Sequence, residues 1–232
     1  MQFNTVDYIF FLPVVVVVYY LIPHRLKWFL LLFASYFFYG CWKVEYLAFI
    51  VSSTLIDFWT GIQMDKRLNQ KKRRPFLFVS LVSNLGLLFF FKYYNFFASN
   101  VNYGTDVGLP IITDIVLPVG ISFYTFQTIS YSLDVYYNRL KAEKHLGYFA
   151  LYVSFFPQLV AGPIERYSNL VPQFKQKLNL SYENFSNGFR QILFGLFTKM
   201  VIADNLSGIV DGVFEEPLKY SSFDLLLSTF FH

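Results

Sequence analysis

A series of apolar stretches, each close to the length that crosses a lipid bilayer, is the feature of this sequence that most restricts its fold. A hydrocarbon core of about 30 Å requires about 20 helical residues at roughly 1.5 Å per residue. Hydrophobic residues make up 55% of the 232 residues and charged residues only 15%, whereas soluble domains carry about 25% charged residues. We therefore predict an all-α, polytopic transmembrane helical bundle. The expected spans cover residues 6–22, 28–43, 46–62, 76–97, 110–137 and 189–210.

Basic residues are concentrated in one loop, and this predicts the orientation of the chain. Residues 65–75 carry six basic side chains against Asp65, a charge of +5, so the rest of the chain sums to −1 within the net charge of +4. No nucleic-acid partner is expected, because the charge lies in one short loop between apolar spans. The positive-inside rule places this loop in the cytoplasm. We accordingly expect a multi-pass protein of the plasma (inner) membrane, with the N-terminus and loop 99–109 outside.

Residues 155–167 interrupt an apolar run with Pro157, Gly162, Pro163 and charged side chains. In hydrocarbon every backbone N–H and C=O needs an internal partner, and proline removes a donor. The break therefore requires protein or water around it. Basic residues flank the apolar segment on both sides: Arg139, Lys141 and Lys144 before it, and Arg166, Lys175 and Lys177 after it. We predict that residues 146–162 are re-entrant, turn at Pro157–Gln158 and return to the same side of the membrane.

The C-terminal part of the chain predicts a surface helix followed by a further span. Residues 181–190 begin with a serine and place apolar side chains on one face, as in a helix at the membrane interface. Within the span 189–210, Lys199 and Asp204 need protein or an end of the bilayer around them. The last apolar segment, 223–231, is too short to cross a membrane. We expect one membrane domain over residues 1–232, incomplete at its C-terminus.

Familiar catalytic motifs are absent from the sequence. It contains no Gly-x-Ser-x-Gly elbow, P-loop, dinucleotide-binding glycine fingerprint or His-Glu-x-x-His motif. Cys41 is the single cysteine and has no metal-ligand spacing around it, so neither an internal disulfide nor a metal site is predicted. His24 lies in a basic hinge, His145 at a helix start and His232 at the last position. None of the three is predicted to be catalytic, and no bound cofactor is expected.

Four blocks of sequence, in order along the chain, carry a resemblance to a known family. They are residues 117–131 with 134–136, residues 155–167, residues 188–190, and residues 195–199 with 202–204. Together they resemble the membrane-bound O-acyltransferase (MBOAT) family, and within it the alginate O-acetyltransferase branch. The resemblance implies a helical funnel through the membrane. In such enzymes an acyl group passes from a cytoplasmic donor to a carbohydrate or polymer hydroxyl outside.

The resemblance also implies reactants and partners. These are a polysaccharide acceptor, the lipid bilayer, an extracytoplasmic acyl-relay protein, and an acyl donor that is either acyl-CoA or an acyl-carrier protein. In this family the histidine regarded as catalytic lies in a downstream Trp-His block. Because no tryptophan precedes His232, we expect the catalytic histidine beyond it, assign no catalytic residue, and expect residues 1–232 alone to be inactive.

The proline break supplies the candidate residues for lining a substrate site or channel. An alternative interpretation remains open for the polar ones: Glu165 and Arg166 pair or extend at the cytoplasmic interface, and Gln158 binds backbone left free by Pro157. The candidates are Pro157, Gln158, Gly162, Pro163, Glu165 and Arg166.

Two other functions are compatible with the sequence. Broken helices and intramembrane acids such as Asp57, Asp134 and Asp204 also occur in transporters and flippases, although no inverted repeat is visible. The third interpretation is an inactive truncated remnant of an acyltransferase.

Overall fold

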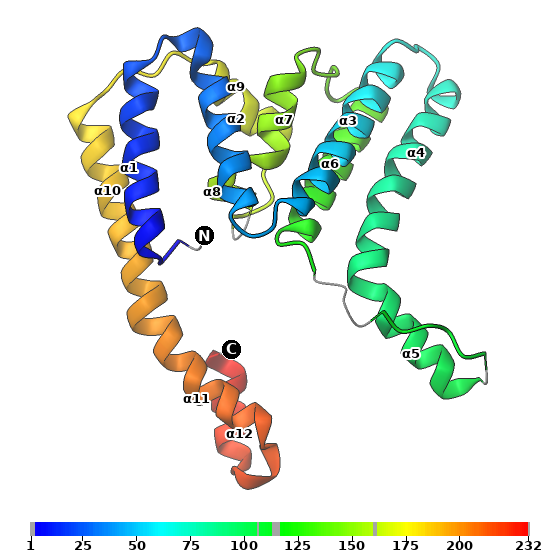
Figure 1. Ribbon diagram of the computed structural model, residues 1–232, viewed down its shortest axis with the longest axis vertical. Coiled ribbons are helices and arrows are strands. Elements are labelled where there is room, and N and C mark those ends of the chain that lie inside the picture. The colour runs from blue at the N-terminus through cyan, green and yellow to red at the C-terminus, as the bar shows by residue number, and fades with distance from the viewer. Residues whose placement is uncertain (1–2, 106, 113–116, 160–161, 232) are drawn as a thin grey trace. The chain divides into compact units, whose positions relative to one another are not determined.

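The computed structural model of the chain describes residues 3–105, 107–112, 117–159 and 162–231, and these residues form helices and no strands (Figure 1). The all-α prediction is confirmed. Leu12–Lys177 form one compact unit, and the described parts of Gln2–Phe11 and Leu178–His232 form a second. The boundary between the units falls within helix α1 (Val6–Leu21). That the whole chain is a single membrane domain stays a prediction.

Nine α-helices begin in the described part of the chain before residue 178. Three helices among all the described residues are long and apolar enough to cross a membrane, namely Glu45–Asp65, Gln70–Gly104 and Tyr182–Glu215. This is the pattern of a multi-pass membrane protein, and the limits of each span in the bilayer stay predictions. After α1 the helices are α2 (His24–Gly40), α3 (Glu45–Asp65), α4 (Gln70–Leu88), α5 (Tyr94–Gly104), α6 (Ile121–Tyr136), α7 (Leu146–Ser154), α8 (Phe156–Leu159) and α9 (Tyr167–Lys175).

The continuous helix that begins with α4, Gln70–Gly104, is longer than the span predicted over 76–97. It begins inside the basic loop, where the Asn69 side chain accepts a hydrogen bond from the backbone N–H of Lys71 (2.9 Å) and so caps the helix. At its C-terminal end, α4 continues through a π-helical turn, Phe89–Tyr93, into α5. The basic residues 71–74 are therefore helical, and the helix reaches Gly104.

A polar cluster lies among α3, α4 and α6, which pack side by side (Figure 1). Asp57 of α3 accepts hydrogen bonds from Ser80 Oγ (2.6 Å) and Asn84 Nδ2 (2.8 Å) of α4. Asn84 Oδ1 in turn accepts from Ser53 Oγ (2.9 Å) and from Thr128 Oγ1 of α6 (3.1 Å). All five side chains are buried. Each carboxylate oxygen of Asp57 thus has a donor, which removes much of the cost of burying a polar group among apolar helices.

Contacts gather the basic segments of the first unit at one end of its helices, the upper end in Figure 1. Arg73 of α4 is only 3% exposed and donates through Nη1 to the carbonyl oxygens of Val135 (3.1 Å) and Tyr136 (3.2 Å). Its guanidinium therefore caps the negative end of α6. At the same end, His24 Nε2 lies 3.2 Å from the carbonyl oxygen of Lys175. The basic segments that share this end are residues 24–27, 65–75, 138–145 and 166–177.

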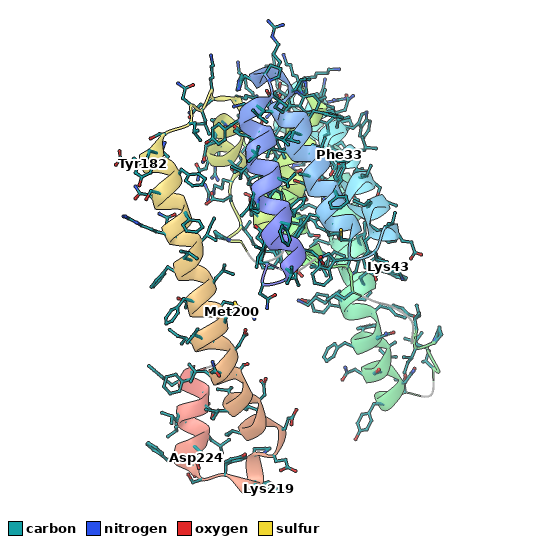
Figure 2. All side chains as sticks on the ribbon, turned by 60° about the vertical axis from the view of Figure 1, so that its left-hand side comes forward. Phe33, Lys43, Tyr182, Met200, Lys219 and Asp224 are labelled. Carbon is teal, nitrogen blue, oxygen red and sulfur yellow. The ribbon has the colours of Figure 1, made fainter. Side chains whose placement is uncertain are left out.

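The second unit is built on one continuous helix. α10 (Tyr182–Phe197), a π-helical segment (Thr198–Ala203) and α11 (Asp204–Glu215) follow one another without a break, and α12 (Ser222–Phe231) packs on α11. No interruption separates the predicted interfacial segment 181–190 from the predicted span 189–210. Figure 2 shows side chains projecting along this helix from Tyr182 past Met200.

Two charged residues of this long helix satisfy each other. Lys199 Nζ lies 2.5 Å from Asp204 Oδ1; Lys199 belongs to the π-helical segment and Asp204 directly follows it. The sequence requires protein or water around these two charges in a membrane, and their mutual ion pair meets part of that requirement.

We predict that Asn84→Ala destabilises the first unit. The substitution removes one donor and one acceptor, and leaves a carboxylate oxygen of Asp57 and the hydroxyl of Ser53 without a partner, whereas Thr128 keeps its bond to the Thr125 carbonyl oxygen. Buried unsatisfied groups of this kind cost about 1–3 kcal/mol, so the midpoint of thermal unfolding in detergent should fall. Ser83→Ala is the control, because Ser83 Oγ bonds only locally, to the Ser80 carbonyl oxygen (3.0 Å). An equal decrease for the two variants would contradict the role given to the cluster.

Candidate functional site

The apolar segment before the proline break bends earlier than the sequence predicts. α7 ends at Ser154, Phe155 leaves helical geometry (φ −54°, ψ 110°), and Pro157 lies in the first turn of the four-residue helix α8. The helix is therefore broken about two residues before the break predicted at Pro157–Gln158, and the point at which the segment turns back stays a prediction. The physical reason is that proline is tolerated in the first turn of a helix, where its missing N–H is not needed, and the chain leaves the helix before it.

A backbone N–H group at the bend is hydrogen-bonded to a neighbouring helix. The N–H of Phe156, the first residue of α8, donates to Ser35 Oγ of α2 (3.2 Å). The Phe38 ring of α2 packs against the Phe156 ring, with 5.6 Å between centroids. A buried N–H that α7 cannot satisfy is thus satisfied by α2, as a membrane interior requires.

Hydrogen bonds join three of the predicted site residues, and a fourth lies directly beside them. Gln158 Nε2 donates to the Pro163 carbonyl oxygen (3.1 Å), and the Gly162 N–H donates to the Gln158 carbonyl oxygen (2.9 Å). A Cβ atom on Gly162 would lie 2.7 Å from Gln158 Cα, so this position requires glycine. Pro157 belongs to α8 directly before Gln158. Residues 160 and 161 of the predicted re-entrant segment lie outside the described residues.

The two central sequence blocks contact each other through α6 and α7. Gln127 Nε2 of α6 donates to the Tyr152 carbonyl oxygen of α7 (2.7 Å). The Tyr152 hydroxyl lies 3.2 Å from the carbonyl oxygens of both Gln127 and Glu165. Before α6, Gly120 adopts φ 74°, and a Cβ there would lie 2.4 Å from the Leu159 carbonyl oxygen. Only glycine combines this backbone geometry with so close an approach.

The remaining two predicted residues, Glu165 and Arg166, lie after the turn. Glu165 Oε2 lies 3.4 Å from Asn169 Nδ2. Arg166 is exposed and precedes α9, and its side chain lines an open pocket of about 270 Å³. The other lining residues are Phe126, Ile129, Ser130, Leu133 and Asp134 of α6, together with Arg139.

A buried carboxylate holds both flanks of the segment 146–162 at the same end of the helices. Glu143 lies 2.5 Å from Lys175 Nζ and accepts hydrogen bonds from the Tyr167 hydroxyl and from the backbone N–H of His145 (2.9 Å). Its own N–H donates to the hydroxyl of Tyr131 in α6 (3.0 Å). The chain thus returns after α8 to the place from which α7 starts. Its position in a bilayer stays a prediction.

The electrostatics of this carboxylate follow from its partners. Burial by itself raises the pKa of Glu143, but the hydrogen bonds from Lys175, Tyr167 and the His145 N–H outweigh it, so the pKa lies below the ordinary glutamate value. Burial, together with the hydrogen bond and the charge of Glu143, raises the pKa of the Tyr167 hydroxyl. Tyr167 therefore stays protonated and remains a donor to Glu143.

The two described histidines make structural contacts. His145 Nδ1 caps α7 by accepting a hydrogen bond from the N–H of Tyr148 (3.3 Å), and its ring packs edge-on against Trp28 with 4.9 Å between centroids. His24 contacts the end of α9, as described above. His232 lies outside the described residues. Neither described histidine lines the pocket, so the structure assigns no general base among them.

Three buried hydroxyls were missed by the sequence analysis. Tyr39 of α2, and Tyr124 and Thr125 of α6, have hydroxyl oxygens that are buried and have no hydrogen-bond partner among the described residues. Tyr39 and Tyr124 belong to the same core cluster. Gln158 Oε1 is likewise buried without a described partner. Aromatic and β-branched residues in an apolar span are normally predicted to pack in the core. That their hydroxyls lack hydrogen-bond partners is visible only in the three-dimensional structure.

The chain matches known proteins over most of its length. Residues 139–232 match the model of MBOAT, the membrane-bound O-acyltransferase family. The chain is 36% identical over 219 residues to the probable alginate O-acetylase AlgI of Pseudomonas syringae pv. tomato, in an alignment that covers 92% of this chain and 42% of that protein. This chain belongs to the membrane-bound O-acyltransferase family. The family predicted from the sequence blocks is confirmed.

Other relatives have similar sequence identities and aligned fractions. The probable alginate O-acetylase AlgI of Pseudomonas aeruginosa is 36% identical, with 92% of this chain and 42% of that protein aligned. The peptidoglycan O-acetyltransferase of Helicobacter pylori is 35% identical, with 94% and 47% aligned. The chain therefore spans less than half the length of these curated relatives. No solved structure matches it significantly.

We predict a pH-dependent contribution of Glu143 to stability. Because the pKa is lower in the folded state than the ordinary value of 4.5, the contribution is fully present above that pH and is lost as the pH falls below it. Unfolding midpoints in detergent should therefore decrease on acidification below about pH 4.5, and Glu143→Gln should be less stable at neutral pH and less sensitive to acid. Glu183→Gln, at an exposed glutamate, is the control. Identical acid sensitivity of Glu143→Gln and the unsubstituted chain would refute the assignment.

Proposed function

We propose that this chain forms part of a membrane-bound O-acyltransferase that transfers acetyl groups to the hydroxyls of a cell-surface or exported polysaccharide. The observation that carries the proposal is that Tyr152 of α7 bridges residues 117–131 and 155–167, through its hydrogen bonds with Gln127 and with the Glu165 carbonyl oxygen. These blocks resemble the family, and relatives named alginate O-acetylase align over 92% of the chain. The sequence similarity therefore covers residues that hold one another in place.

The polar interior supports a contribution to an acyl-transfer site. Transfer to a hydroxyl requires a base for its proton. It also requires hydrogen-bond donors for the oxyanion that forms at the carbonyl oxygen when the acyl carbon is attacked. The buried side chains with free polar atoms, Gln158, Tyr39, Tyr124 and Thr125, are groups of the right chemistry to hold a hydroxyl or a carbonyl oxygen. We assign them to substrate positioning and assign the base to no described residue.

The donor and acceptor are parts of the same proposal. We propose acyl-CoA or an acyl-carrier protein as the cytoplasmic donor, and an extracytoplasmic protein that relays the acyl group to the polymer. The names of the relatives support two acceptor classes, alginate and peptidoglycan. Alginate-type polysaccharide is our first choice, because the Pseudomonas relatives carry that name.

The proposed donor side requires the basic end of the helices to lie in the cytoplasm. We predict that Lys72→Cys reacts with a membrane-impermeant thiol reagent only from the cytoplasmic side, and Tyr103→Cys, 97% exposed, only from outside. Both are made in a Cys41→Ala background, because Cys41 is the single cysteine and is exposed. Labelling of intact cells is compared with labelling of inside-out vesicles. Reaction of both positions from one side would overturn the orientation.

A chimera tests the function itself. We predict that residues 1–232, placed in P. aeruginosa alginate O-acetylase in exchange for the aligned segment, restore alginate acetylation in a strain lacking that protein. Gln127→Leu in the chimera should lower acetylation about tenfold, which corresponds to roughly 1.4 kcal/mol of lost positioning. Its control is Gln173→Leu, at an exposed glutamine that bonds only to Asn169 within α9.

The outcomes of the chimera experiment separate the alternatives. Absence of acetylation by a chimera present at normal level would refute the proposed function. Equal activities of Gln127→Leu and Gln173→Leu would refute the role of the contact between α6 and α7 while leaving the family function intact. Residues 1–232 expressed alone are expected to transfer no acetyl group, since both described histidines make structural contacts.

A further inference from the structure

The pocket beside α6 has an apolar wall and a cationic rim. Phe126, Ile129 and Leu133 lie on one face of α6, because residues three, four and seven apart share a helix face. The core-facing side of α6 is a different one, so this strip borders the packed interior without belonging to it. Arg139 and Arg166 lie among the lining residues beyond the end of α6. A pocket of this kind suits a molecule with an apolar part and an anionic head.

The rim keeps an uncompensated positive charge. Asp134 is the single carboxylate among the described lining residues, and its Oδ1 lies 3.9 Å from Arg139 Nη1, at the limit of an ion pair. Arg166 forms no ion pair with any described residue. Its neighbour Glu165 is directed to Asn169 instead. Two guanidinium groups against one carboxylate leave the rim with a charge of +1 and one arginine free to bind an anion.

The rim also lies at the depth where lipid headgroups are expected. α6 ends at Tyr136, close to Arg139, and its last carbonyl groups bond to Arg73 of the basic segment of α4. α3 and α4 are long and apolar enough to cross a membrane, so the basic segment that joins them lies near the boundary between hydrocarbon and water. Phosphate groups occupy this boundary, and the cytoplasmic leaflet carries anionic lipids.

We infer that this pocket binds the phosphate group of an anionic phospholipid. Arg166 and Arg139 donate to the phosphate oxygens, and the acyl chains lie along Phe126, Ile129 and Leu133. Asp134 orients Arg139 and lowers the affinity for more highly charged headgroups by repulsion. The lipid in this site is neither the acyl donor nor the acceptor of the proposed reaction.

The size and character of the pocket favour a lipid over a nucleotide-bearing donor. Pockets for drug-sized ligands usually measure about 300–1,000 Å³, and this one measures about 270 Å³. That space suits a phosphate with a small headgroup. The apolar strip of α6 gives lipid chains a continuous surface, whereas coenzyme A would place polar groups against it.

The test uses purified residues 1–232 in a neutral detergent. The chain is titrated with phosphatidylglycerol or with phosphatidylcholine, and bound lipid is counted by native mass spectrometry. Phosphatidylglycerol should bind more tightly, and Arg166→Gln should weaken it about fivefold, the factor expected for one basic side chain near an anionic lipid surface. Asp134→Asn should strengthen it, and Arg166→Lys should retain part of the affinity.

Arg74→Gln is the matched control, because Arg74 is exposed in the basic segment of α4 and does not line the pocket. It should leave the preference for phosphatidylglycerol unchanged. Equal affinities for the two lipids, or equal losses for Arg74→Gln and Arg166→Gln, would overturn the inference. Inorganic phosphate and coenzyme A serve as competitors. Displacement of the lipid by coenzyme A but not by inorganic phosphate would assign the pocket to the acyl donor, and displacement by neither supports the phospholipid.

Discussion

Every buried backbone N–H and C=O group must find a hydrogen-bond partner, most strictly in hydrocarbon, and the break between α7 and α8 depends on meeting this requirement. The chain meets this requirement with side chains from parts of the sequence that the sequence alone does not connect to the break. Ser35, 121 residues away, accepts the N–H of Phe156, and Gln158 donates to the carbonyl oxygen of Pro163. Bent backbone is therefore stable here only because α2 and the turn after α8 are already in place.

Polar contacts between helices supply the stabilisation here that apolar packing supplies in the core of a soluble protein. Lipid chains are as apolar as leucine, so burying apolar side chains between helices gives little net stabilisation in a membrane. Asp57 and Asn84 accordingly join α3, α4 and α6, and Gln127 and Tyr152 join α6 to α7. α6 takes part in both sets of bonds with its core-facing side chains and leaves its other strip to the pocket.

The sequence predicts the kind of fold well, because length, composition and the proline break are local properties. It also brings Pro157, Gln158, Gly162 and Pro163 together as one candidate group. It misplaces the bend, since Pro157 is accommodated in the first turn of α8 and Phe155 leaves the helix. It cannot find the hydroxyls of Tyr39 and Tyr124, because their lack of partners is a property of distant neighbours. The role of Glu143, which binds Lys175 32 residues away, is hidden for the same reason.

Arg73 has one role predicted for membrane insertion and a second role in the folded chain. In the predicted orientation, its charge is one of those expected to retain loop 65–75 in the cytoplasm during insertion. In the folded chain the same guanidinium is buried and closes the end of α6, 62 residues later in the sequence. A charge that is predicted to orient α3 and α4 thus also binds the end of a helix that is synthesised after them. Moving this charge across the membrane would require breaking its bonds to α6, so the packing of α6 would hold whichever orientation insertion has set.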